Sequence, residues 1–200
     1  MDGVEEREVK MAVPSGFVMP QIDALAGVTV TDRGDELLHA VYWDSGDLAL
    51  ARAGIGVRHR NGVWTFKGRS RRDGDAVVRE ELELPGDADH LPEALRERLA
   101  RWADVSLVHP IAELRALRHT LDVSDEIHFA EVVHDRVSVR DGADERGRFE
   151  EVEVEYPTAS APLADRVVTL FVDNGATIDG TAKYVRALRF LGHDPPEVTA

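Results

Sequence analysis

Hydrophobic and polar residues alternate along many segments of the chain, a pattern typical of β-strands with one buried face. The alternation predicts strands at residues 5–13, 28–31, 36–43, 54–60, 63–69, 76–84, 110–123, 127–133, 136–140 and 148–156. Asn61-Gly62 separates two of these strands and is a strong signal for a tight hairpin. Apolar residues at helical spacing predict helices near 19–26, 91–103, 163–174 and 182–191, with a single helical turn at 48–53.

The order of these elements predicts one antiparallel α+β domain, because the helices cluster at hairpins and at the end of the chain. We expect this domain to cover residues 1–194 and residues 195–200 to form a frayed tail. The polar stretch 141–147 is expected to be a loop inside a long hairpin.

Charged residues occupy one whole face of several predicted strands. Acids are concentrated in the first and last strands and bases in the central hairpin, with these residues sharing faces: Glu6, Glu8 and Lys10; Arg58 and Arg60; Thr65, Lys67 and Arg69; Arg79, Glu81 and Glu83; Glu151, Glu153 and Glu155. A solvated outer face is one explanation of such a pattern. The alternative is a closed sheet around a charged cavity, which would suit an anion held by basic residues and a hard divalent cation held by carboxylates.

Composition narrows the possible functions. The chain of 200 residues has no cysteine, which excludes thiolate nucleophiles and Cys-ligated metal centres. Its net charge of −14 makes it a poor non-specific binder of nucleic acid. No apolar run is long enough to span a membrane and no secretory leader opens the sequence, so we expect a cytoplasmic protein with neither a membrane nor a nucleic-acid partner.

Lysine is rare in this chain. Lys10, Lys67 and Lys183 are the only lysines among 24 basic residues, and the others are arginines. Chance survival of three lysines is the simplest explanation, but each of them lies inside a recognisable motif.

The segment Glu6-Arg7-Glu8-Val9-Lys10 is an E-x-E-x-K motif, for which chance predicts only ~0.02 matches along the chain. It resembles the signature of the CYTH superfamily, the triphosphate tunnel metalloenzymes. The resemblance continues in order over residues 4–190, through Tyr42-Trp43-Asp44, Val57-Arg58-His59-Arg60, Thr65-Phe66-Lys67, Arg79-Glu80-Glu81-Leu82-Glu83, Phe149-Glu150-Glu151-Val152-Glu153 and Ala182-Lys183-Tyr184. Three positions depart from the family pattern: Trp43 for Tyr or Phe, Ala182 for Ser, and Ala116 for the Thr that more often precedes the basic residue Arg118.

The resemblance implies a closed, antiparallel, eight-stranded β-barrel that forms a hydrophilic tunnel, with helices outside it and at the C-terminus. It implies a divalent metal, Mg²⁺ or Mn²⁺, and a small-molecule triphosphate as substrate. Carried over by motif, the metal ligands would be Glu6, Glu8, Glu151 and Glu153, with Asp135 as a plausible further ligand. The phosphate-binding residues would be Lys10, Arg58, Arg60, Lys67, Arg118 and Lys183. Glu81 and Glu83 resemble tunnel acids of unassigned role, and His59, on the opposite face of its strand, is expected to be structural.

We therefore expect metal-dependent hydrolysis of inorganic triphosphate or a similar molecule, with Lys67, Glu8 and Glu153 as catalytic residues. Lys67 or a metal-bound hydroxide could activate the attacking water. An adenylyl cyclase of class IV type and a non-catalytic polyphosphate-binding module remain alternatives. No P-loop and no Ser-His-Asp or Cys-His set is apparent, and the oligomeric state cannot be predicted from the sequence.

Overall fold

The structure is a computed structural model that describes residues 3–195. Its strands are β1 (Val4–Val13), β2 (Thr29–Asp44), β3 (Gly56–Arg60), β4 (Val63–Lys67), β5 (Arg71–Asp73), β6 (Ala76–Pro85), β7 (His109–Ser124), β8 (Phe129–Asp141), β9 (Asp144–Glu155) and β10 (Thr177–Ile178). Its α-helices are α1 (Ala49–Arg52), α2 (Glu93–Leu99), α3 (Ala161–Asp173) and α4 (Lys183–Phe190), with short 3₁₀ turns at Ile22–Ala24, Val105–Leu107 and Thr158–Ser160. Apart from Pro195, the predicted tail lies outside the described residues.

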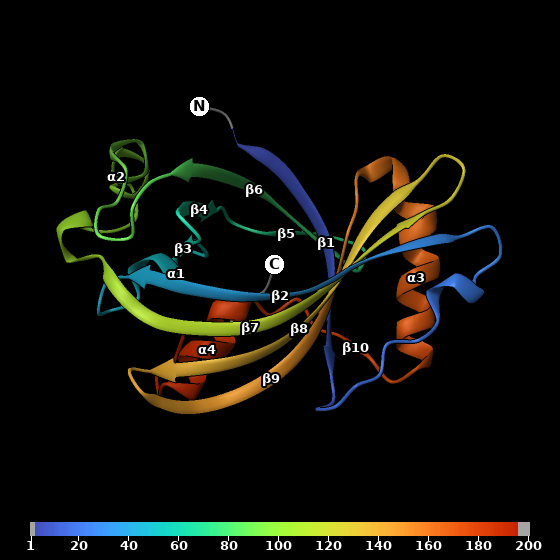
Figure 1. Cartoon of the computed structure of the whole chain (residues 1–200). Coiled ribbons are helices and arrows are strands. Elements are labelled where there is room, and N and C mark those ends of the chain that lie inside the picture. The colour runs from blue at the N-terminus through green and yellow to red at the C-terminus, as the bar shows by residue number, and fades with distance from the viewer. Residues whose placement is uncertain (1–2, 196–200) are drawn as a thin grey trace.

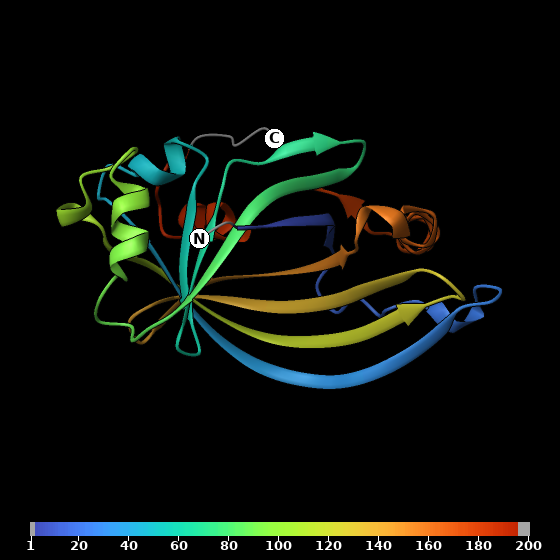
Figure 2. The ribbon, with the colours of Figure 1, turned by 90° about the horizontal axis from the view of Figure 1, so that it is seen from above.

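Eight of the strands close into a ring. They pair antiparallel in the order β1-β9-β8-β7-β2-β3-β4-β6, and β6 pairs again with β1. Strand β5 adds to β6 and β10 adds to β1 outside this ring. The long strands β2, β7, β8 and β9 bow around one side, as Figures 1 and 2 show from two directions. The predicted α+β fold with a closed eight-stranded sheet is confirmed.

Two strands are longer than the sequence pattern predicts. The pair of strands expected at 28–31 and 36–43 is one strand, β2, because a register shift between Asp32 and Gly34 absorbs the extra residue while pairing with β7 continues. Strand β8 likewise runs unbroken through residues 134–135, where a gap was predicted. The prediction of a loop at 141–147 is also wrong: Asp141 pairs with Asp144, so the turn is tight and Gly142 takes the positive φ of 59° that it requires.

Helices α2 and α3 cover the outside of the ring. Helix α3 buries Leu163, Val167 and Phe171 against the outer faces of β1, β8 and β9. Near the opposite end, α2 packs Leu95 and Leu99 in the core cluster formed by the outer residues of β3, β4 and β6. None of the described helices is long and apolar enough to cross a membrane.

Helix α4 has a different position, because it packs on the inner side of the ring. Its residues Val185 and Leu188 join a core cluster with Leu114, Val137 and Val139. Leu114 lies on the same face of β7 as Arg118, and Val137 on the same face of β8 as Asp135, so this is the inward face. The helix therefore fills one part of the ring and leaves a smaller polar space beside its first residues.

Candidate functional site

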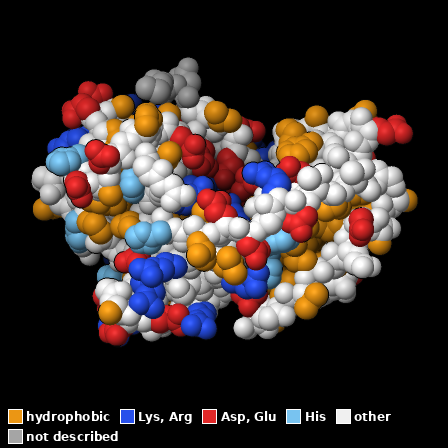
Figure 3. Space-filling view, viewed as in Figure 1, with side chains coloured by type: hydrophobic (Ala, Val, Ile, Leu, Met, Phe, Trp, Pro, Cys, Tyr) orange, Lys and Arg blue, Asp and Glu red, His pale blue; other side chains and the backbone are white. Residues whose placement is uncertain are grey.

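Charged side chains line a cavity of about 220 Å³ inside the ring. Figure 3 shows the hollow, with acidic and basic side chains inside it. The charged residues that line it are Glu6, Lys10, Arg58, Arg60, Lys67, Arg79, Glu81, Glu83, Arg118, Glu131, Glu153, Glu155 and Lys183. All six predicted phosphate-binding residues are among them, together with Glu81 and Glu83. The one-sided charge of these strands therefore faces an internal cavity.

The side chains on the opposite faces of the same strands are apolar or, like His59, have a structural role. His59 lies between two cavity-lining arginines in sequence, but its Nε2 is 3.0 Å from the carbonyl oxygen of Gly86 and its ring packs on Trp64. The side chain thus faces the outer side of the ring rather than the cavity, as the alternation of β3 predicts.

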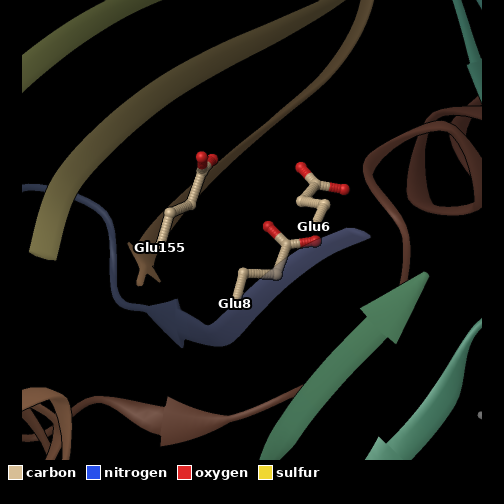
Figure 4. Close-up of side chains that lie close together, drawn as sticks. All are labelled: Glu6, Glu8 and Glu155. Atoms are coloured by element: carbon tan, nitrogen blue, oxygen red, sulfur yellow. The ribbon is translucent and has the colours of Figure 1, made fainter. Parts of the chain in front are cut away.

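Two groups of carboxylates lie in or beside the cavity. In the first acidic group (Glu6, Glu8 and Glu155) one oxygen of each side chain lies within 4.8 Å of the others. Figure 4 shows these three side chains close together. Arg79 pairs with both Glu6 and Glu8. Glu155 has no ion pair with any residue in 3–195. Burial and the carboxylates of Glu153, Glu8 and Glu6 raise the pKa of Glu155 to about 7.

The second acidic group (Asp135, Glu151 and Glu153) is equally compact but carries its own cations. Arg118 forms two hydrogen bonds to Asp135, of 2.8 and 2.6 Å, and Lys183 lies 3.0 Å from Glu151. Burial alone would raise the pKa of Asp135, but Lys183 and Arg118 more than offset it and lower this pKa to about 2. Asp135 and Glu153 of this group are therefore neutralised by basic side chains, whereas burial raises the pKa of Glu151 and neither of its carboxylate oxygens has a hydrogen-bond partner among the described residues.

Lys10 connects the two acidic groups. Its ammonium pairs with Glu153 of the second group and lies 3.0 Å from Glu8 of the first. Lys67 has a comparable position on the other wall, 3.0 Å from Glu6 and 2.9 Å from Glu81. Both lysines are thus held between carboxylates from different strands, and with Lys183 they line the same cavity.

Arg58 and Arg60 differ from the other predicted phosphate-binding residues. Neither forms an ion pair with a carboxylate of residues 3–195, and Arg58 donates only a hydrogen bond of 3.1 Å to Thr65. Burial and the positive charges of Arg58 and Arg118 lower the pKa of Arg60. Two neighbouring guanidinium groups without a counter-ion are an arrangement that favours an anionic ligand.

Three charged cavity residues were not assigned a role from the sequence: Arg79, Glu131 and Glu155. The alternation had placed Arg79 and Glu155 on the charged faces of their strands, but no motif role was available for them. Glu131 shares the inner face of β8 with Asp135. The break predicted within this strand separated the two residues and hid that relation.

Comparison with known proteins identifies the fold. A sequence profile of the CYTH domain matches residues 5–186. The chain belongs to the CYTH domain family. Members of this family act on triphosphate substrates and generally depend on a metal. A search of curated protein sequences gives no significant match.

Solved CYTH-fold structures resemble the chain over nearly their full length at low identity. HpAC1 from Hippeastrum, an adenylyl cyclase candidate described as having a dominant triphosphatase activity, is 17% identical with a TM-score of 0.61, over 96% of this chain and 98% of that one. A candidate adenylate cyclase from Bacillus halodurans is 15% identical with a TM-score of 0.57, over 93% of this chain and 98% of that one. At such identities the likeness concerns the fold alone.

Proposed function

We propose that this CYTH protein hydrolyses a small triphosphate, inorganic triphosphate in the first place, in a reaction that requires a divalent cation. One observation carries the proposal: among residues 3–195, Arg58 and Arg60 have no carboxylate partner and Glu155 has no cation partner, yet all three line one cavity. A polyanion together with a cation would neutralise both unpaired charges at once.

The first acidic group fits a hard divalent cation. Its donors are three carboxylates, the ligand type that Mg²⁺ and Mn²⁺ prefer, and their nearest oxygens lie within 4.8 Å of one another. Glu6 and Glu155 line the cavity, so an ion held there would also reach a ligand in it. When bound, such an ion would offset negative charge on the phosphate oxygens.

The basic residues would orient the triphosphate and neutralise its charge, which are the main requirements of phosphoryl transfer. We assign the first contacts with phosphate to Arg58 and Arg60, because they need not leave a carboxylate to bind it. Lys67, as an ammonium between Glu6 and Glu81, has no lone pair with which to accept a proton. We therefore assign Lys67 to stabilisation of charge on the substrate rather than to proton abstraction.

The cavity supports hydrolysis better than adenylyl cyclisation. Tyr42 and Tyr184 are the only aromatic residues lining it among the described residues, and both are buried and stacked on each other, with ring centres 5.7 Å apart. Neither offers a free ring face to an adenine base. The triphosphatase activity described for HpAC1 supports the same preference.

A product assay tests the proposal. The protein is incubated with Mg²⁺ or Mn²⁺ and either tripolyphosphate, thiamine triphosphate or ATP, and the products are identified. We expect phosphate release from tripolyphosphate that stops in excess chelator, and loss of this activity in Arg58→Ala. Formation of cyclic AMP as the main product, or tight binding of tripolyphosphate without turnover, would contradict the proposal.

A further inference from the structure

A groove lies on the outer face of the long strands, away from the inner cavity. In Figure 2 these strands bow outward between α2 at one end and α3 at the other, and none of the helices that the structure describes lies outside the bow of β2, β7 and β8. The groove has a volume of about 580 Å³ and is lined by residues of β2, β7, β8 and β9, by the end of β1 and by Ser15 in the loop that follows. This volume falls within the range of about 300–1,000 Å³ that is typical of small-molecule sites.

Two leucines form an apolar floor in this outer groove. Leu37 and Leu117 are direct partners on β2 and β7, and both line the groove. Leu37 is 79% exposed, and neither leucine belongs to a core cluster of the described residues. Outward positions of an antiparallel sheet are ordinarily polar. The adjacent leucines therefore offer a contact surface to an apolar group.

Three arginines surround one serine beside this floor. Ser138 of β8 is the direct partner of Arg115 on β7 and of Arg148 on β9, and Arg136 lies two residues away on the same face of β8. Long side chains at direct and diagonal positions of neighbouring strands are within reach of one another. The three guanidinium groups can therefore converge on an anion above the Ser138 hydroxyl. In the lower part of Figure 3 basic side chains gather over these strands.

Arg136 has no acid to balance its charge. Its direct partner on β9 is Glu150, but one oxygen of Glu150 accepts a hydrogen bond of 2.7 Å from the amide of Gly16 and the other lies 2.9 Å from Nε2 of His134. Arg136 forms no ion pair with a carboxylate of residues 3–195. An exposed guanidinium beside two others, without a counter-ion of its own, favours an anionic ligand.

The other two arginines are only partly balanced. Arg148 contacts Glu145 at 2.6 Å, and Arg115 lies 3.4 Å from Glu113. Both arginine side chains are exposed, and ion pairs of exposed side chains are weak, about 0–1 kcal/mol. Both arginines can therefore turn toward a ligand at little cost.

We propose that the outer groove is a second ligand site, which binds a small molecule that carries one anionic group and an apolar body. The anionic group lies over Ser138 between the three arginines, and the apolar body lies over Leu37 and Leu117. A strongly acidic macromolecule or an anionic membrane is disfavoured, because the net charge of −14 repels both. A second copy of the chain is disfavoured too, since an isologous contact would place arginines against arginines.

Fluorescence of anilinonaphthalene sulfonate, a sulfonate with an apolar aromatic body, tests the proposal on the whole protein. We expect saturable binding that decanoate displaces, because decanoate combines an anionic group with an apolar chain. Inorganic phosphate lacks the apolar body and decyltrimethylammonium has the opposite charge, so neither should displace the dye at the same concentration. Displacement by phosphate or by decyltrimethylammonium as effective as by decanoate would overturn the proposal.

Variants of the groove locate the dye. Arg136→Gln should weaken its binding about tenfold or more, because a charge-assisted contact is lost, and Leu37→Ser about threefold or more. Arg96→Gln removes an exposed charge from α2 and is the matched control, with binding expected within about twofold of the wild type. Arg115→Gln replaces Arg136→Gln if that variant does not fold. Equal binding to the groove variant and to the control would overturn the proposal.

Two further measurements distinguish the outer groove from other sites. Arg58→Ala changes only the inner cavity and should leave dye binding within about twofold of the wild type; loss of binding in this variant would place the dye in the cavity and contradict the proposal. Vesicles of phosphatidylcholine and phosphatidylserine should not sediment the protein. Sedimentation that Arg136→Gln abolishes would identify a membrane surface as the partner instead. None of these measurements depends on hydrolysis of a triphosphate, so failure of the proposed function leaves the test intact.

Discussion

Glu8 and Glu155 lie directly opposite each other on β1 and β9, two carboxylates on the same inward face of the ring. Like charges at opposite positions of an antiparallel pair are destabilising. Glu8 is balanced by Arg79 and Lys10, whereas Glu155 has no such partner among residues 3–195. The metal-free protein therefore contains a local electrostatic cost that a proton or a cation at Glu155 would remove.

The first prediction is that Glu155→Gln stabilises the metal-free protein at neutral and alkaline pH. Folding raises the pKa of Glu155 from 4.5 to about 7, so its contribution to stability is fully present below pH 4.5 and is lost as the pH rises to 7. Above pH 7 the variant should be more stable by up to about 3 kcal/mol. Thermal unfolding of both proteins in chelator at pH 5 and pH 8 measures the difference.

Addition of Mn²⁺ provides the control for this prediction. The wild type should gain thermal stability with Mn²⁺ at pH 8, and the variant should gain much less, because the ion binds the folded state through Glu155. Parallel pH profiles of the two proteins in chelator would show that Glu155 carries no unbalanced charge.

The second prediction concerns Arg60, which has no carboxylate partner among the described residues. Arg60→Ala removes a partly desolvated cation without leaving a buried acid unpaired, so the free energy of unfolding should change by less than about 1 kcal/mol. Binding of tripolyphosphate should nevertheless weaken by about tenfold or more, because a charge-assisted contact is lost. Calorimetric titration and urea unfolding measure the two effects.

Two further variants, His59→Ala and Arg118→Ala, serve as controls for the effect of Arg60→Ala. His59→Ala, on the outer face of the same strand, should leave tripolyphosphate binding within about twofold of the wild type. Arg118→Ala should lower stability as well as binding, because it leaves Asp135 with fewer partners. A larger binding defect in His59→Ala than in Arg60→Ala would mean that the inward and outward faces are reversed.

The sequence predicts which residues line the cavity better than it predicts which of them form ion pairs with one another. Strict alternation places Glu6, Glu8 and Lys10 on one face whatever their partners are, and the hairpin at Asn61-Gly62 does the same for Arg58 and Arg60. Local pattern is sufficient for such statements, since each depends on a few neighbouring residues. The family resemblance added the closure of the ring.

Pairing across the ring could not be predicted in this way. Lys10 contacts Glu153, 143 residues away, only because β1 pairs with β9 as the ring closes. Glu131 was missed for a related reason: the polar residues His134 and Asp135 within β8 suggest a break, although the strand continues and Asp135 faces inward like Glu131. Which acid is neutralised by a base, and which is left for a metal, depends on these long-range contacts.

The third prediction tests how α4 is attached to the β8–β9 hairpin. The ring of Phe190, the last residue of α4, lies on Gly147, and a Cβ at that position would be only 2.1 Å from the Phe190 ring. Gly147→Ala should therefore displace the end of α4 and lower the stability of the protein by about 1–3 kcal/mol. Chemical denaturation measures the loss.

Phe190→Leu in the Gly147→Ala background provides the test of cause. A smaller side chain makes room for the added methyl group, so the second change should restore part of the stability lost in Gly147→Ala. If Phe190→Leu only adds to the loss, steric contact between these two positions is not its source.

The last prediction concerns the residue that begins α4. Ala182 occupies the N-cap position with φ −63° and ψ 141°, an extended conformation suited to a capping residue, but it has no side-chain oxygen to accept a hydrogen bond from the helix. Ala182→Ser would supply that oxygen and should stabilise the protein by about 1 kcal/mol, or roughly 2–4 °C in melting temperature. Ala182→Val adds bulk without an acceptor and serves as the control. An equal rise in melting temperature for both variants, or none for Ala182→Ser, would show that α4 does not gain from a capping side chain at position 182.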